Sequence, residues 1–260
     1  MRLLAFCEAP ADFRLTAGLV DRVLREQGPS WVVDNFDMPE VIRVWHPDPS
    51  GRAYFDLHTL NEYMDRLSVP TTRGYFNDRP GGAGSSMVRK ALRIVRALSK
   101  RQPDESIDAV VLVWDMDQQP DGRRAGVALA RDEARGWAAF QVVCGFQDPE
   151  REAWVLAGYD PCDEAERALL AELHDALDFS PVVHAARLRD KSAGAARNIK
   201  RVLGRLTRDD PDREERCWTD PPLATLRERG GESGLADFLD EIEHILLPLL
   251  DPRVSHQARA

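Results

Sequence analysis

Asp115 and Asp117 follow a run of apolar and β-branched residues that begins at Ala109. An apolar run this short, with polar turn-forming sequence on both sides, is typical of a buried parallel strand. Ligands of open α/β sheets bind beyond the carboxyl ends of such strands. The two-residue period of a strand directs both carboxylates to one face if it continues through Met116. Because a divalent cation relieves the repulsion between adjacent carboxylates, the pair predicts a metal site, with a polar turn as the alternative.

Two other expected strands are also followed by acidic residues. The strands cover residues 2–7 and Ala139–Cys144, and the acids that follow them are Glu8 with Asp12 and Glu150 with Glu152. Because parallel strands end at the same edge of a sheet, we expect these carboxylates beside Asp115. Simpler roles stay open for two of them, since Asp12 suits a helix cap and Glu150 suits the start of a helix.

Basic residues recur along one side of two expected helices. The stripe in the helix at about 86–101 is Arg89, Arg93, Arg96 and Lys100, and the stripe in the helix at 190–207 includes Arg197 and Arg201, with Lys191 and Lys200 nearby. Such stripes suit the phosphate backbone of nucleic acid, which they bind without reading its sequence. A solvated helix face is the simpler interpretation of each stripe.

The order of the expected elements predicts an α/β core at residues 1–160 and a helical extension at 161–260 packed on that core. An irregular insertion occupies about 34–84, with a short strand expected just before it at Trp31–Val33 and one helix within it near Thr59–Leu67. The chain has 260 residues, of which 43% are hydrophobic, so it can fill a sizeable core.

Composition and charge exclude several classes of protein. The net charge of −9 argues against uniform coating of DNA, and no apolar run approaches the length of a membrane span. The four cysteines lie far apart without a CxxC pair, which is typical of free thiols in a reducing compartment. We therefore expect a cytoplasmic protein that has no membrane partner.

The segments Phe6-Cys7-Glu8-Ala9-Pro10 and Val113-Trp114-Asp115-Met116-Asp117 resemble the two acidic motifs of the TOPRIM fold, the topoisomerase–primase module. That family has a Glu after its first strand and a DxD pair after a later strand. The spacing of Glu8 and Asp12 is similar to that in the nuclease branch represented by the overcoming-lysogenization-defect (OLD) nucleases. The resemblance implies a Rossmann-like, mostly parallel sheet flanked by helices.

Two further segments, Phe140–Trp154 with its Glu152-Ala153-Trp154 and the stretch from Lys191 through Leu206, are similar to a family of uncharacterised bacterial TOPRIM-like proteins. Genes of that family often lie beside a gene for an ATPase. The resemblance covers most of the chain apart from 34–84. It departs from the usual pattern at Ala9, where the family has Gly.

A DxD pair also occurs in two other classes of enzyme. In haloacid-dehalogenase phosphatases, Thr or Val follows two residues after the second Asp, where this chain has Gln119. Glycosyltransferases use the pair to hold the metal of a nucleotide sugar. Neither class accounts for Glu8 together with Asp12, so the TOPRIM resemblance ranks first.

The resemblance implies a nuclease that uses Mg²⁺ or Mn²⁺ to cleave phosphodiester bonds. The expected metal ligands are Glu8, Asp115 and Asp117 for a first ion, with Glu152 and Asp12 for a second. Lys191 or Lys200 is expected to neutralise charge on the phosphate, and the arginines at 89, 93, 96, 197 and 201 to contact the nucleic-acid backbone.

The resemblance also implies partners. We expect nucleic acid, DNA rather than RNA, and an ATPase that acts with this chain in a bacterial anti-phage or genome-maintenance system; self-association stays open. The second hypothesis is a catalytically weak TOPRIM-like subunit that binds and regulates an ATPase.

Overall fold

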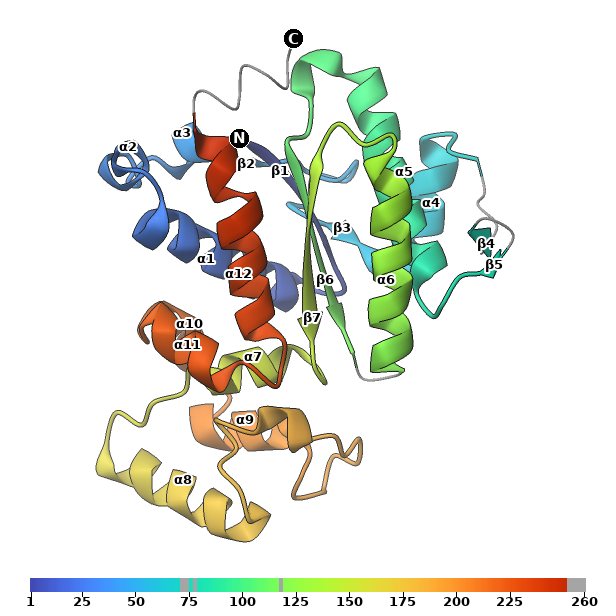
Figure 1. Cartoon of the computed structure of the whole chain (residues 1–260). Helices are drawn as coiled ribbons and strands as arrows, with labels where there is room; N and C mark the ends of the chain where they lie inside the picture. The colour runs from blue at the N-terminus through green and yellow to red at the C-terminus, as the bar shows by residue number, and fades with distance from the viewer. Residues whose placement is uncertain (71–74, 77–78, 117–118, 252–260) are drawn as a thin grey trace.

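The computed structural model describes residues 1–70, 75–76, 79–116 and 119–251, and within them a parallel five-stranded sheet lies between layers of helices (Figure 1). Its strands are β1 (Arg2–Cys7), β2 (Val44–Trp45), β3 (Phe55–Asp56), β6 (Ala109–Asp115) and β7 (Gln141–Gln147). β1 pairs with β6 and β6 with β7, while β2 and β3 pair with successive parts of β1. A separate antiparallel hairpin joins β4 (Tyr75–Phe76) and β5 (Arg79–Pro80). The fold is thus α/β and Rossmann-like, as expected at this level.

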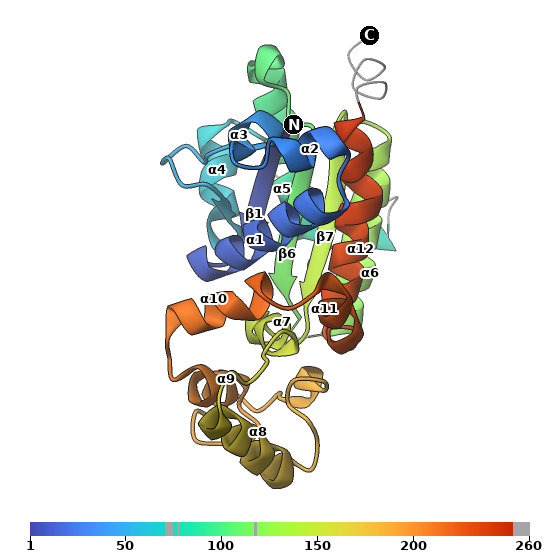
Figure 2. The same cartoon turned by 90° about the vertical axis from the view of Figure 1, so that its left-hand side faces the viewer.

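The hydrophobic core has two parts, one on each face of the sheet, because side chains alternate between the two faces along the inner strands. Leu3 and Val111 belong to a cluster with α1 (Pro10–Gln27) and α12 (Leu235–Ile245). Leu4 and Val110 belong to the opposite cluster, with α4 (Leu60–Arg66), α5 (Ser85–Arg101) and α6 (Pro120–Arg135). Because successive strand side chains point to opposite faces, an apolar run without polar alternation requires helices on both sides. Figure 2 shows α1 lying across one face beside α12.

The turn after β1 brings the chain directly into α1. Pro10 occupies the first helical turn, where its missing N–H costs nothing, and the carboxylate of Asp12 accepts a hydrogen bond from the backbone N–H of Ala9 at 2.8 Å. The helix ends at Gln27, before Gly28-Pro29. The expected strand, acidic turn and helix are therefore confirmed.

The insertion is where the structure departs most from expectation. Trp31–Val33 is not a strand but part of the short helix α2 (Ser30–Asp34), in which only Val32 is buried. The backbone N–H groups bond back along the chain, that of Val32 to the Pro29 carbonyl oxygen at 2.8 Å and that of Asn35 to the Val32 carbonyl oxygen at 3.2 Å, as in a helix. The helices α3 (Pro39–Ile42) and η1 (Leu57–Thr59) follow, and the helix expected near Thr59–Leu67 is confirmed as α4.

Two later elements have other bounds than expected. The strand expected at Ala139–Cys144 extends to Gln147, which brings its end closer to Glu150. The helix expected at 190–207 begins only at Ile199, where Asn198 accepts a hydrogen bond from the backbone N–H of Arg201. An Asn cap of this kind marks the start of a helix, so residues 190–197 form a loop.

The chain after β7 is mainly helical. Its helices are α7 (Arg151–Ala157), α8 (Glu164–Leu177), η3 (Ala185–Arg187), α9 (Ile199–Thr207), α10 (Pro211–Thr219), α11 (Leu223–Arg229), α12 and η4 (Leu247–Leu250). α8 and α9 lie beyond the carboxyl ends of β6 and β7 (Figure 1). α12 instead packs on β7 and α1, so the last part of the predicted helical extension belongs to the layer that covers the sheet.

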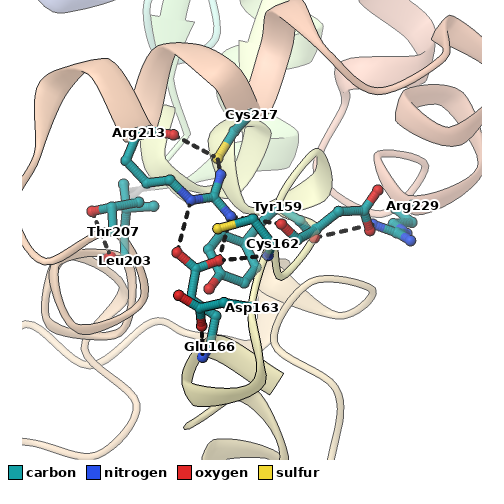
Figure 3. A network of polar contacts seen from close by, with 10 residues as sticks. Tyr159, Cys162, Asp163, Glu166, Leu203, Thr207, Arg213, Cys217 and Arg229 are labelled. Carbon is teal, nitrogen blue, oxygen red and sulfur yellow. Dashed lines mark hydrogen bonds and ion pairs between the residues drawn. The ribbon is translucent and has the colours of Figure 1, made fainter. Parts of the chain in front are cut away.

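A buried ion pair joins α8 to α10. Arg213 binds both carboxylate oxygens of Glu166, at 3.1 and 2.8 Å, and donates to the carbonyl oxygen of Asp160 at 2.6 Å (Figure 3). Its guanidinium lies 4.4 Å from the ring centre of Tyr159. Hydrogen bonds from Arg213 lower the pKa of Glu166 to about 2. All these contacts are internal, and they fix the position of α8 against the core.

Across the described ranges, no helix combines the length and the apolar character needed to cross a membrane.

Candidate functional site

The carboxyl ends of β1, β6 and β7 bring acidic residues from three parts of the chain to one edge of the sheet. Glu8 follows β1 directly, Asp115 is the last residue of β6, and Glu150 and Glu152 follow β7. Asp12 comes from the first turn of α1. Asp117, expected in the same site, lies outside the described residues.

Asp115 is the most perturbed carboxylate of this edge. One of its oxygens, Oδ1, is buried and has no hydrogen-bond partner among the described residues. Burial raises the pKa of Asp115 to about 8, and repulsion from Asp12, Glu8, Glu152 and Glu150 adds to the effect. At neutral pH this carboxyl therefore needs a proton or a nearby cation.

Asp12 has more than the capping role that its position suggests. Burial raises its pKa to about 6, even though the hydrogen bond from the Ala9 N–H and the charge of Arg151 act in the opposite direction. Repulsion from Glu8 and Glu152 contributes to the increase. Burial is the main cause of the raised pKa, and the contributions of Glu8 and Glu152 show that Asp12 also lies within the electrostatic reach of the other carboxylates.

Glu8 is contacted by one residue of β6 and one of η1. Its Oε1 accepts a hydrogen bond from the indole Nε1–H of Trp114 at 3.0 Å, and Nε2 of the exposed His58 lies 4.0 Å from the same oxygen.

Glu152 lies 3.4 Å from the guanidinium of Arg151, which also binds Glu214 of α10 at 3.0 Å. Arg151 thus supplies positive charge to one side of the cluster.

The two candidate lysines both contact Glu150. Lys191 forms an ion pair with Oε1 of this largely buried carboxylate, and Lys200 of α9 lies 2.9 Å from Oε2. Burial alone would raise the pKa of Glu150, but the two lysines lower it below its usual value. The structure therefore brings both lysines to the site through Glu150.

The arginines of the expected stripe on α5 are largely engaged within the protein. Arg89 is buried and binds Glu133 of α6 at 2.5 Å, Arg93 lies 3.9 Å from the same side chain, and Arg96 lies over the ring of Trp137. This stripe is turned partly toward α6 rather than toward solvent.

The second stripe lies near the lysines. Arg197 lies over the ring of Phe179, and Arg201 donates a hydrogen bond to the carbonyl oxygen of Gly194 at 2.5 Å. The side chains of Lys191 and Lys200 are about half and two-thirds exposed. This end of the molecule therefore has accessible positive charge beside the carboxylates.

Gln147 and Asp148 are site residues that the sequence did not single out. Gln147 pairs in register with Asp115 and is buried, and its Nε2 has no hydrogen-bond partner within the described ranges. Asp148 binds Arg189 at 2.5 Å and lies 3.5 Å from Arg124. The feature that could have indicated Gln147 is the pairing of β7 with β6, which places Gln147 opposite Asp115. This pairing could not be predicted because β7 continues past Cys144, where the strand was expected to end.

The donors at this edge suit Mg²⁺ or Mn²⁺, because they are carboxylate oxygens and the buried Oδ1 of Asp115 lacks a partner. In the part of the chain that the structure describes, no group of three or more His, Cys, Asp or Glu side chains is already arranged around one point. Glu8 and Glu152 instead turn to Trp114 and Arg151. Holding an ion thus requires these side chains to reorient.

Comparisons with models of protein families, with curated proteins and with solved structures found no match for this chain.

Proposed function

We propose that this protein is a TOPRIM-type nuclease that uses Mg²⁺ or Mn²⁺ to cleave phosphodiester bonds of nucleic acid. One observation carries the proposal: Asp115 ends an inner strand with a buried oxygen that has no hydrogen-bond partner among the described residues, and burial and four nearby acids raise its pKa to about 8. Like-charged side chains are gathered at such cost mainly where a cation or a proton transfer uses them.

In this proposal Glu8, Asp115 and Asp117 hold the first ion, and Asp12 and Glu152 contribute to a second. Bound there, the ions would activate water and stabilise the leaving oxygen. The protein's own contribution is to keep the carboxylates together: the end of β6 is bonded to β7 through the Met116 N–H and the Gln147 carbonyl at 2.8 Å.

The lysines supply the charge that a phosphodiester requires. Lys191 and Lys200 contact Glu150 but remain well exposed, so a phosphate oxygen can compete for their ammonium groups. Arg197 and Arg201 extend the positive charge along the backbone of the substrate, and Arg89, Arg93 and Arg96 on α5 have a smaller part because of their internal contacts.

The net charge of −9 predicts modest affinity for nucleic acid by the chain alone, which fits a protein that works with a partner. On the resemblance to the TOPRIM-like family, we propose DNA as the substrate and an ATPase as that partner. We propose that the two act together in a bacterial anti-phage or genome-maintenance system in the cytoplasm.

Cleavage of a supercoiled plasmid tests this proposal. The wild type should nick or linearise the plasmid with Mg²⁺ or Mn²⁺ and not with EDTA, and Asp115→Ala plus Asp117→Ala should reduce cleavage to background. The matched control is Asp132→Ala plus Asp175→Ala, which removes two exposed carboxylates elsewhere and should leave cleavage unchanged.

Two results would count against the proposal in different ways. No metal-dependent cleavage by the wild type, alone or with the product of its neighbouring gene, rules out the nuclease. Cleavage that survives the double substitution rules out the site.

One observation favours a second function, that of a catalytically weak subunit that binds and regulates an ATPase. Glu150 is neutralised by Lys191 and Lys200, and Glu152 lies beside Arg151, so the protein compensates part of the acidic charge itself. In that case the plasmid stays intact with metal, while the chain changes the rate of ATP hydrolysis by its partner.

A further inference from the structure

Two carboxylates in the turn after β7 contact basic side chains of one later segment. Oδ1 of Asp148 accepts a hydrogen bond from the guanidinium of Arg189 at 2.5 Å. Glu150 contacts two lysines, since its Oε1 accepts a hydrogen bond from Lys191 and its Oε2 lies 2.9 Å from Nζ of Lys200. Three basic side chains therefore meet at one short acidic turn.

The acidic and the basic partners differ in their exposure to solvent. Asp148 and Glu150 are 7% and 8% exposed. The side chains of Arg189, Lys191 and Lys200 are 46–66% exposed. Phosphate oxygens bind guanidinium and ammonium groups through the same charge-assisted hydrogen bonds as carboxylates do. An anion can therefore reach the basic groups from solvent and replace the carboxylates, which stay buried in the turn.

The segment that carries these basic groups, residues 189–200, has internal contacts that fix its conformation. Arg189 and Asn198 form an antiparallel bridge, and the backbone N–H of Asp190 donates to the carbonyl oxygen of Arg197 at 3.2 Å. Residues 189–194 are exposed. The segment therefore does not depend on the acidic turn for its conformation, and its ion pairs can open without unfolding it.

We propose that the acidic turn is an internal competitor of the substrate. Asp148 and Glu150 occupy the groups of Arg189, Lys191 and Lys200 that bind the phosphates of DNA, and bound DNA displaces the two carboxylates. This inference rests on the proposed action on nucleic acid, adds Arg189 to the residues that bind phosphate, and requires no metal ion. The contacts lower the affinity of the free protein for DNA, because each must be exchanged when DNA binds.

The first test measures binding of a fluorescently labelled DNA duplex by anisotropy, in EDTA so that no cleavage occurs. We expect Asp148→Asn plus Glu150→Gln to bind roughly 10-fold more tightly than the wild type, because each partly exposed ion pair that no longer has to be broken is worth up to about fivefold. Asp132→Asn plus Asp175→Asn changes the net charge equally at two well-exposed positions, and screening by salt should limit its effect to about twofold.

A double-mutant cycle separates direct competition from a general effect of charge. If Asp148 competes with DNA for Arg189, then Arg189→Gln costs more affinity in the Asp148→Asn background than in the wild type, where the arginine gives up a carboxylate to gain a phosphate. The same holds for Lys200→Ala in the Glu150→Gln background. A general effect of charge gives equal losses in both backgrounds.

A measurement on the wild type makes the test independent of how well these variants fold. A water-soluble carbodiimide joins a carboxylate to an amine that it contacts, so it should cross-link Glu150 to Lys191 or Lys200, as detected by mass spectrometry of the digested protein. We expect saturating DNA to suppress this cross-link. A peptide nucleic acid of the same sequence, which has no phosphates, should leave it unchanged.

The outcomes distinguish this inference from the function on which it rests. If the variant without the two acids binds DNA no more tightly than its charge-matched control, or if the cross-link persists at saturating DNA, the internal competition is overturned and the proposed nuclease is not. If neither the wild type nor Asp148→Asn plus Glu150→Gln binds DNA, the proposed action on nucleic acid is overturned together with the competition. Binding by that variant alone would support the competition.

Discussion

Asp115 combines two properties that are unfavourable for stability: one of its oxygens is buried without a hydrogen-bond partner in the described part of the chain, and four other carboxylates lie near it. At the scale of single residues this is the feature that most needs explanation, because a buried charge without compensation is costly. If Asp115 belonged only to a polar turn after a strand, nothing would offset the cost of burying its carboxylate among the others. A cation that binds the cluster would offset the cost, which is why we assign these residues to a metal site.

The raised pKa values predict that the stability of the metal-free protein depends on pH. Asp12 and Asp115 have pKa values of about 6 and about 8 in the folded chain, both above the usual value near 4. Between pH 4 and 8 the folded state therefore binds more protons than the unfolded state, so the free energy of unfolding falls as pH rises. Urea unfolding in EDTA at pH 5, 6.5 and 8 measures the slope.

Asp115→Asn is the variant that identifies the source of this slope. The amide cannot ionise, so the variant should unfold at a higher temperature than the wild type at pH 8 and lose most of the pH dependence, while Asp132→Asn should behave as the wild type. A slope that is the same in Asp115→Asn and the wild type would show that Asp115 is not the titrating group.

The identities of the acidic residues were visible in the sequence, whereas their partners were not. Glu8, Asp115, Glu150 and Glu152 follow apolar runs, Asp12 lies in the helix that comes after the first of them, and parallel strands end at the same edge of the sheet. The contacts from Trp114 to Glu8 and from the lysines to Glu150 span about 106, 41 and 50 residues of chain. No local pattern encodes such pairs.

At the scale of elements, the segment from Arg189 to Lys200 brings its charges to the turn after β7. Arg189 binds Asp148, and Lys191 and Lys200 bind Glu150, so three basic side chains contact two acids of one short turn. The sequence predicted one continuous helix at 190–207, but Asn198 caps α9 and leaves the preceding residues as a loop. That loop is what allows Lys191 to reach the same carboxylate as Lys200.

We predict that Lys191→Ala plus Lys200→Ala reduces the rate of plasmid cleavage roughly 100-fold while Mg²⁺ affinity changes little, because the lysines act on the phosphate and not on the cation. The pKa of Glu150 should rise as its two partners are removed. Lys90→Ala, on α5 but outside the basic stripe, serves as the control. A loss of Mg²⁺ affinity equal to the loss of rate would show that the lysines support the carboxylates instead.

The pair of Glu166 and Arg213 should be the main polar link between α8 and α10. Glu166→Ala leaves the buried guanidinium without its carboxylate, and we expect a loss of about 3–5 kcal/mol in the free energy of unfolding measured with urea. Glu164→Ala removes the carboxylate of an exposed ion pair with Arg167 on the same helix and should cost no more than about 0.5 kcal/mol. Equal losses in the two variants would mean that the buried pair has no special part in holding α8.

At the scale of the whole molecule, the α/β architecture follows from the apolar strands, whereas the assembly of the C-terminal helices does not. Residues 109–114 and 3–7 are apolar throughout, which requires helices on both faces of the sheet. We expected the C-terminal helices to pack on the core, but the sequence does not indicate that α12 covers β7, where its Phe238 and Leu239 are buried beside α1. The helical period of a sequence shows which side of a helix is buried, but not against which part of the protein that side packs.

The site lies where the two parts of the molecule meet. The sheet supplies the carboxylates, and the loop and helix beyond its carboxyl edge supply the lysines (Figure 1). This distribution allows a polyanion to bridge both parts, with its phosphate between the acidic and the basic groups.

Calorimetric titration of Mn²⁺ into the metal-free protein at pH 7, in two buffers with different heats of ionisation, tests the central claim most directly because it counts the protons released. With a pKa of about 8, Asp115 is mostly protonated at pH 7. A metal bound to its carboxylate must displace that proton, so we predict release of roughly one proton per ion in the wild type and almost none in Asp115→Asn. A wild type that binds no Mn²⁺, or that binds it without releasing a proton, would contradict the account.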